Sequence, residues 1–127
     1  KAVLGLPITI ANQNVIFSYL YIDDFVRIVE HFIEHRGKEK FYNAVPDETA
    51  DLLSIARKVV DVSGKDLEII VKNKGMGNEY TGDNSRLRKE MSSFKFTSMD
   101  DGIRKLHGWY EQNKDSLSRE KLVADRY

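Results

Sequence analysis

The sequence contains no cysteine, and its 127 residues include only two prolines and one tryptophan. Without cysteine the chain has neither disulfides nor a thiolate metal site, which is compatible with a reducing cytoplasm. An excess of either charge is also missing, because 20 basic residues balance 20 acidic ones. General binding to nucleic acid or to an anionic membrane needs a basic field, so this balance argues against both partners.

Long apolar runs are absent as well, and neither a membrane-spanning segment nor a signal peptide is recognisable. What is present is an ordinary globular composition, with 41% hydrophobic and 31% charged residues in a length that suits one domain. Because the first residue is Lys1 and not Met, we expect a piece of a longer or processed protein.

The clearest landmark is residues 19–25, where an aromatic run changes into an acidic helix start. A helix is predicted over residues 22–35, with Asp23 and Asp24 in the first turn, where the helix dipole favours negative charge. Its large apolar residues share one stripe: Ile22, Phe25, Val26, Val29, Phe32 and Ile33. Ile28 lies off this stripe, which indicates a helix that is covered on more than one side.

The remaining pattern is that of an α/β protein. Strands are predicted at residues 7–11, 15–21, 41–45 and 67–71, and the second, third and fourth helices at residues 49–63, 86–91 and from residue 97 onward. Thr49 is the expected N-cap of the second helix. In the last helix we expect four apolar residues to be buried, namely Ile103, Leu106, Trp109 and Tyr110. A strand-helix-strand unit is expected around residues 15–45.

Three short patterns have a chemical and a structural interpretation. Gly75-Met76-Gly77 lacks the third glycine of a dinucleotide-binding turn, so a flexible loop is favoured. Tyr110 and Lys114 have a Tyr-x-x-x-Lys spacing that could activate a phenol, but core packing is the simpler interpretation of Tyr110. His31 and His35 are four apart, and without a third ligand they are better interpreted as surface residues than as a metal site.

In their order and spacing, four motifs resemble the C-terminal portion of the NAD(P)-dependent epimerase/dehydratase family. These enzymes are extended short-chain dehydrogenases/reductases that modify nucleotide sugars. The resemblance rests on residues 19–25 before an apolar helix, residues 41–45 before a Leu-rich helix, residues 80–90 with their Asp-x-Ser helix start, and residues 96–103 followed by Trp109-Tyr110.

The resemblance implies an incomplete fragment of a Rossmann-type two-domain enzyme, in which a small mixed sheet and about four helices form a substrate-binding lobe. Residues 1–45 would complete the cofactor-domain sheet, residues 46–113 would form the lobe, and residues 114–127 a charged tail. NAD or NADP would bind in the full-length protein and not to this chain. No catalytic, cofactor-binding or metal-binding residue is therefore assigned here, and the chain alone is expected to be inactive.

The resemblance also implies where a sugar nucleotide would bind. Many family members place an Arg before the aromatic strand, and this chain has Phe17 there. A second family Arg falls near Asn73, where Lys72 and Lys74 can meet a phosphate as point charges. The candidate substrate-binding residues are Lys72, Asn73, Lys74, Tyr80 and Arg86. The alternative is a stand-alone, non-enzymatic binding or interaction domain that uses the loop at residues 72–82.

Two further expectations concern association and location. If residues 15–45 normally pack against a sheet that lies elsewhere in a longer protein, the apolar stripe of their helix has no partner in this chain. Exposed stripes of this kind tend to be buried by self-association, so we expect a homo-oligomer with a contact through residues 15–45. A cytoplasmic location is expected.

Overall fold

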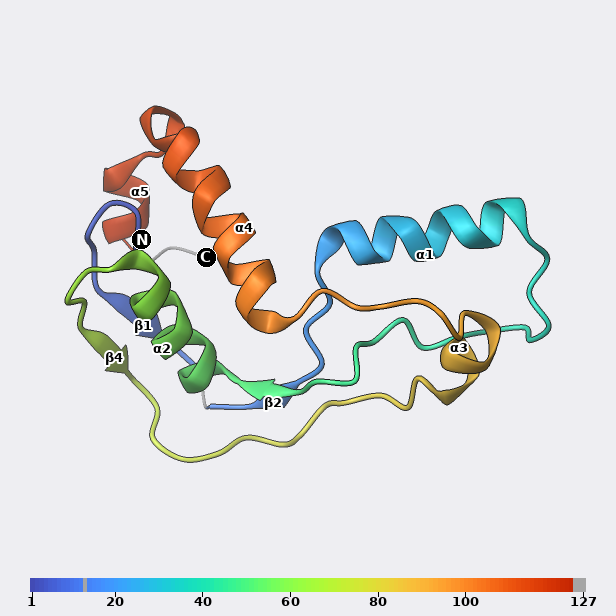
Figure 1. Ribbon diagram of the computed structural model, residues 1–127. Coiled ribbons are helices and arrows are strands. Elements are labelled where there is room, and N and C mark those ends of the chain that lie inside the picture. Colours follow the sequence, from blue (N-terminus) through green and yellow to red (C-terminus); the bar gives the residue numbers. More distant parts are fainter. Residues whose placement is uncertain (13, 125–127) are drawn as a thin grey trace.

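The computed structural model describes residues 1–12 and 14–124. Figure 1 shows two groups of elements joined by extended segments. One group contains β1 (Ile8–Ile10), β4 (Ile69–Val71), α2 (Leu52–Ser63), α4 (Met99–Gln112) and α5 (Arg119–Val123). The other contains α1 (Ile22–Glu34) and α3 (Ser85–Glu90), and the short strands β2 (Ile16–Phe17) and β3 (Ala50–Asp51) lie between the groups. A 3-10 helix, Lys114–Ser116, separates α4 from α5.

The α/β class is confirmed, with five α-helices and two small sheets in the described part of the chain. The expected single mixed sheet is split into two pairs of strands. β1 and β4 are parallel, with Ile8 opposite Ile69, whereas β2 and β3 are antiparallel, with Phe17 opposite Ala50. The helices α2 and α4 pack against each other beside the parallel pair.

The strand predicted at residues 41–45 is not formed, so the strand-helix-strand unit around residues 15–45 is absent as well. Side-chain contacts hold this segment in place of a sheet ladder. The Tyr42 ring lies 4.6 Å from the Phe32 ring, and the Tyr42 hydroxyl donates to Glu90 Oε2 at 3.0 Å. Asn43 Nδ2 donates to the Asp83 carbonyl at 2.8 Å. An aromatic run between turns therefore packs as an irregular segment.

The second helix begins later than predicted. Asp51, and not Thr49, is the N-cap of α2, because its side chain accepts a hydrogen bond from the Ser54 backbone N–H at 2.9 Å. Carboxylates and hydroxyls cap helices about equally well, so composition alone does not separate the two positions. Thr49 precedes β3, whose pairing with β2 sets the start of α2.

The apolar stripe predicted on α1 is real, but it is the exposed face of the helix. Ile28, the residue off the stripe, is 3% exposed and forms a core with Leu87 and Phe94. In contrast, five of the six stripe residues are exposed large hydrophobics: Ile22, Phe25, Val26, Val29 and Ile33. Phe32 is half-buried against the Ile28 core. The helix therefore uses its less apolar side for packing within the chain.

In α4 the expected burial is wrong for three of the four apolar residues. Ile103 is buried, whereas Leu106, Trp109 and Tyr110 are 52%, 55% and 40% exposed. At about 100° per residue, Trp109 points about 120° away from Ile103, so one contact face cannot bury both. Leu106 and Tyr110 instead line an apolar cavity of about 350 Å³ between α2, α4 and the chain ends.

Candidate functional site

The candidate site begins where the two parallel strands end. Because β1 and β4 run in the same direction, their carboxyl ends meet at one edge, the usual place for ligands in α/β proteins. Lys72, directly after β4, donates its backbone N–H to the Ile10 carbonyl at 2.9 Å. Asn73 Nδ2 donates to the Ala11 carbonyl at 2.8 Å. These bonds hold residues 72–74 beside the end of β1.

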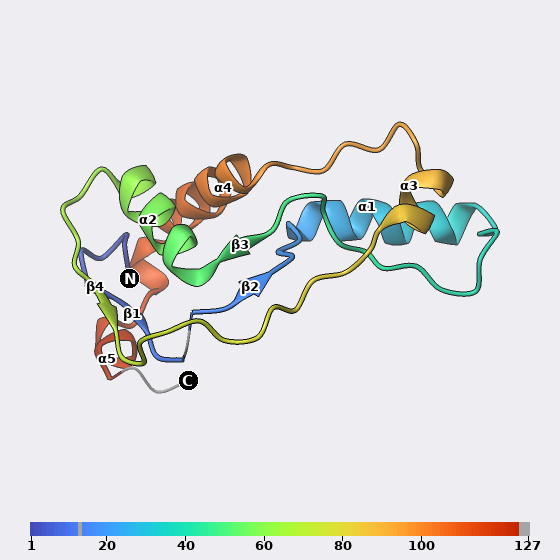
Figure 2. The same ribbon diagram turned by 90° about the horizontal axis from the view of Figure 1, so that it is seen from below.

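A second wall comes from the segment that follows this edge. Figures 1 and 2 show the chain after β4 running alongside β2 toward α3. Gly77 donates its N–H to the Asn14 carbonyl at 2.6 Å, and Tyr80 donates its N–H to the Ile16 carbonyl at 2.9 Å. The Tyr80 ring meets the Phe17 ring edge to face, with the centroids 6.0 Å apart. An aromatic pair therefore stands next to the strand end.

Between these walls lies an open groove of about 800 Å³, called here the strand-end groove. It is lined by Asn12, Val15, Phe17, Leu52, Lys72, Asn73, Lys74, Gly77 and Asn78. Two lysines and three amide side chains supply its polar surface, and no carboxylate lines it among the described residues. The groove therefore suits an anionic ligand with hydroxyl groups, which lysines attract and amides can hydrogen-bond.

Asn14 and Asp51 fix the position of β2 at the base of this region. Asn14 Nδ2 donates to Asp51 Oδ1 at 2.9 Å, and Asn14 Oδ1 accepts from the Leu53 N–H at 3.1 Å. Hydrogen bonds from the side chain and the backbone of Ser54 and from Asn14 lower the pKa of Asp51 to about 2. A charged Asp51 therefore holds α2, β2 and the groove wall together.

The structure brings together three of the five predicted substrate-binding residues. Lys72, Asn73 and Lys74 line the strand-end groove, together with Phe17. Tyr80 stands beside Phe17 and is 77% exposed. Arg86 does not line the groove; it lies in α3, with its guanidinium carbon 4.5 Å from the centre of the Phe41 ring. Arg86 is thus close to the loop in sequence, but its guanidinium contacts Phe41 outside the groove.

Sequence reasoning missed other groove residues, chiefly Asn12, Leu52 and Asn78. Asn12 could have been found, since it directly follows a predicted strand whose carboxyl end is a common ligand position. Leu52 and Asn78 carry no such signal. Their position depends on the pairing of β2 with β3 and with the segment at residues 76–80, which links distant parts of the chain.

Within the described residues, the glycine loop after β4 does not form a dinucleotide-binding turn. Such a site needs a glycine turn that opens a helix, whose N-terminal N–H groups bind the pyrophosphate. Gly75 and Gly77 are instead followed by an extended segment as far as Asn84, next to α3. Tyr110 and Lys114 also do not share a helix, because α4 ends at Gln112.

The described residues form neither a metal site nor a membrane-spanning helix. Within residues 1–12 and 14–124, no group of three or more His, Asp or Glu side chains could hold a metal ion. None of the helices in the same ranges is long and apolar enough to cross a membrane. His31 and His35 stack with ring centroids 4.6 Å apart, and the His35 ring nitrogen Nδ1 lies 3.1 Å from the His31 carbonyl oxygen.

Comparison with known proteins places this geometry in context. No family model matches the chain. A curated relative is the trifunctional UDP-glucose 4,6-dehydratase/UDP-4-keto-6-deoxy-D-glucose 3,5-epimerase/UDP-4-keto-L-rhamnose-reductase of Arabidopsis thaliana. It is 28% identical over a comparison of 120 residues that covers 90% of this chain and 18% of that protein. The chain thus spans less than a fifth of this relative.

Solved structures with the same fold include three proteins of low sequence identity. RMD from Pseudomonas aeruginosa, complexed with NADPH, has a TM-score of 0.71 at 14% identity and matches 84% of this chain. UDP-glucuronic acid 4-epimerase from Bacillus cereus, in complex with NAD, has a TM-score of 0.70 at 20% identity over 92%. dTDP-glucose 4,6-dehydratase from Bacillus anthracis, in complex with NAD, has a TM-score of 0.72 at 17% identity over 90%. This chain covers 36%, 37% and 37% of those chains, respectively.

Proposed function

We propose that the chain, a distant relative of the NAD(P)-dependent epimerase/dehydratase family, is the C-terminal, substrate-binding part of such an enzyme acting on a nucleotide sugar. The parent reaction would be an epimerisation, dehydration or reduction in the cytoplasm, with NAD or NADP bound by another part of the protein. Residues 1–45 would adjoin the cofactor lobe, and residues 46–113 would cover the sugar nucleotide.

The strand-end groove is the observation that carries this proposal. Lys72 and Lys74 supply positive charge for a phosphate group, and the amide side chains can bond sugar hydroxyls. Tyr80 and Phe17 offer an aromatic edge to a nucleobase or a sugar ring. The family Arg that would grip a diphosphate is replaced by Phe17, so binding by this chain should be weak.

Titration with UDP-glucose, uridine, inorganic pyrophosphate and NAD tests the proposal. In amide NMR spectra, UDP-glucose should shift the signals of residues 72–80, and NAD should not. Substituting Lys72 or Lys74 by Met should weaken UDP-glucose binding about three- to tenfold, whereas Lys105→Met on α4 should have no effect. Equal affinity for pyrophosphate and UDP-glucose would support the alternative of a stand-alone anion-binding module that uses residues 72–82.

A second proposal concerns association. We infer that the chain forms a homo-oligomer through residues 15–45, because five large apolar side chains of α1 are exposed. Sedimentation velocity over a range of concentrations measures this directly. A single monomeric species at the highest concentration would exclude it.

A further inference from the structure

The backbone at residues 1–6 has the geometry that ends an α-helix. The Leu6 N–H donates to the Lys1 carbonyl at 3.0 Å, and the Gly5 N–H donates to the Ala2 carbonyl at 3.0 Å. Gly5 has a φ of 67°, in the left-handed region. This pair of hydrogen bonds with a left-handed glycine closes the last turn of many helices. A single turn is costly to form by itself, so such an ending suits a helix of several turns.

Two cationic side chains bind the carbonyl groups of this turn. Lys65 Nζ donates to the Ala2 carbonyl at 3.0 Å and to the Val3 carbonyl at 2.6 Å. Arg119 Nη1 donates to the Leu4 carbonyl at 3.2 Å. Positive charge at this position stabilises the negative end of a helix dipole, which is the sum of aligned peptide dipoles along the helix. One turn offers few such dipoles, so the two cations also suit a longer helix.

The same residues are buried, whereas the first residues of a domain are usually exposed and loosely held. Ala2, Val3 and Leu6 are 6%, 4% and 6% exposed. Burial, together with the positive charges of Lys1 and Lys65, lowers the pKa of the terminal amino group. A charged group is therefore disfavoured at this place, whereas a peptide N–H, as found inside a helix, carries no charge.

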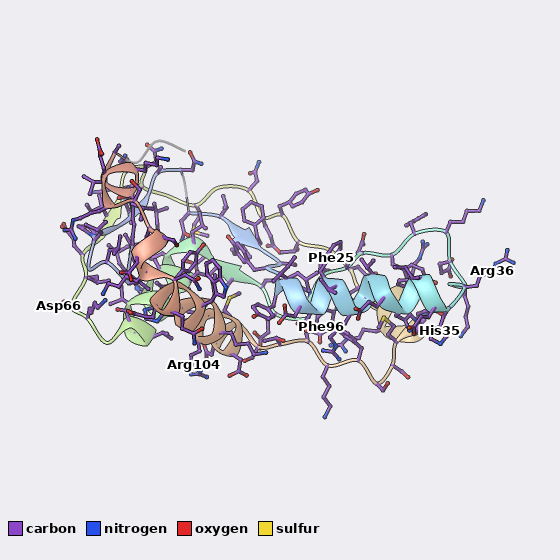
Figure 3. The ribbon with its side chains drawn as sticks, turned by 90° about the horizontal axis from the view of Figure 1, so that it is seen from above. Phe25, His35, Arg36, Asp66, Phe96 and Arg104 are labelled. Atoms are coloured by element: carbon purple, nitrogen blue, oxygen red, sulfur yellow. The ribbon has the colours of Figure 1, made fainter. Side chains whose placement is uncertain are left out.

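An apolar cavity of about 350 Å³ opens beside this turn. Residues 1–3 line it together with Ile55 and Val59 of α2 and with Leu106 and Tyr110 of α4. Figures 1 and 3 show α2, α4 and α5 together at one end of the molecule, with the C-terminal half of α1 at the other. The cavity therefore lies directly beside the helix ending and far from the exposed face of α1.

We propose that the cavity holds the earlier turns of the helix that ends at Leu4. This helix is amphipathic and belongs to the segment that directly precedes Lys1 in a longer protein. Because Lys1 itself lines the cavity, those turns begin at its wall. They bury Leu106 and Tyr110, which are 52% and 40% exposed without them. The inference rests on the part of the proposed function that makes this chain a piece of a longer protein, and not on sugar-nucleotide binding.

Two N-terminal extensions of the chain, each of about four helical turns, test this occupant. The in-phase extension places leucines about three, four and seven positions before Ala2 and Val3, on the face that they share. The out-of-phase extension has the same composition, with its leucines on the opposite face. The in-phase extension should raise the midpoint temperature of unfolding by at least about 4 °C and shift the methyl NMR signals of Val59 and Leu106. The out-of-phase extension should do neither, and the Val29 signals on α1 should stay unchanged in both.

A charge on the cavity wall tests where the extension packs. Leu106→Glu should be tolerated in the chain without an extension, because Leu106 is 52% exposed there. In the in-phase extension the same substitution buries a charge and should remove most of the gain in midpoint temperature. Ile33→Glu is the matched control, since Ile33 is 79% exposed on α1 and should leave the gain intact.

Several results would overturn the proposal. Equal midpoint temperatures for the two extensions would do so, and so would a gain that Leu106→Glu leaves intact, because the added helix would then lie outside the cavity. Indole, a small apolar probe, should bind beside Val59 in the original chain and be excluded by the in-phase extension. Equal indole binding to both would show that the cavity is still open. These measurements contain no nucleotide, so they succeed or fail independently of UDP-glucose binding in the strand-end groove.

Discussion

The Asp24 carboxylate accepts two hydrogen bonds from Thr97, one from its backbone N–H at 2.6 Å and one from its hydroxyl at 3.1 Å. Asp24 is 1% exposed, and Arg27 Nη1 lies 3.3 Å from its Oδ1 atom. These hydrogen bonds hold the first turn of α1 against the segment that leads into α4. A helix-dipole interaction alone does not explain a carboxylate that is this deeply buried.

Replacing Asp24 should therefore destabilise the fold strongly. Asp24→Ala removes the acceptor for two donors of Thr97 and should lower the free energy of unfolding by about 2–4 kcal/mol. Asp23→Ala, on the same helical turn but exposed, should cost less than about 1 kcal/mol. Urea unfolding followed by circular dichroism measures both. Equal effects would mean that the contact with Thr97 contributes nothing beyond helix-end charge.

The two sides of α1 should differ in the same kind of experiment. Ile28→Ala opens a cavity beside Leu87 and Phe94 and should cost about 2–4 kcal/mol. Ile33→Ala, the matched exposed substitution, should change the unfolding free energy by less than about 1 kcal/mol in dilute monomer. If Ile33→Ala greatly lowered the unfolding free energy under those conditions, the apolar stripe of α1 would be packed within the chain.

Asp51 should make stability depend on acid. Its folded-state pKa of about 2 lies below the ordinary value of 3.8, so its stabilising bonds are fully present above about pH 4. They are lost as the pH falls through about 2. Asp51→Ala should cost about 1–2 kcal/mol at pH 7, the usual range for a helix N-cap.

The same variant supplies the control for pH. Because Asp51→Ala has no carboxylate at this position, the difference from wild type should shrink between pH 4 and pH 2, where wild type loses the charge. Unfolding curves at pH 7, 4 and 2.5 measure the difference. A constant difference across this range would place the acid sensitivity in other carboxylates.

Phe17 offers a gain-of-function test of the proposed substrate. Phe17→Arg adds a bidentate donor to a groove that already contains Lys72 and Lys74, and it should tighten UDP-glucose binding about tenfold in calorimetry. Phe17→Leu is the control, because it loses the ring contact with Tyr80 without gaining charge and should weaken binding. An unchanged affinity in a folded Phe17→Arg variant would remove Phe17 from the ligand site.

Local pattern was sufficient to predict the α1 helix and the loop that lines the groove. The periodicity from Ile22 to Ile33 depends on neighbours along the helix, and the loop at residues 72–82 is marked by its glycines. Which side of α1 is buried could not be predicted in this way. That side is fixed by Leu87 and Phe94, which are more than fifty positions away from Ile28.

The same distinction applies to the candidate site. Lys72, Asn73 and Lys74 were predicted because the family resemblance places an Arg near Asn73, and they lie together in the groove. Arg86 was also a candidate in the resembling segment, yet it stacks on Phe41, a residue from a segment that was expected to form a strand. The absence of a strand at residues 41–45 and the position of Arg86 outside the groove thus have one cause. This cause is the packing of an irregular aromatic segment against α1 and α3.

The pairing of Ile8 with Ile69 also has a consequence for how the molecule folds. These two residues are far apart in the sequence, and closing the long loop between them costs entropy before any hydrogen bond between the strands is gained. Contacts between such distant residues therefore form slowly. The helices, which are built from near neighbours, should appear first. The strand-end groove exists only after β1 and β4 have met, so ligand binding in a refolding experiment should lag behind the recovery of helical signal.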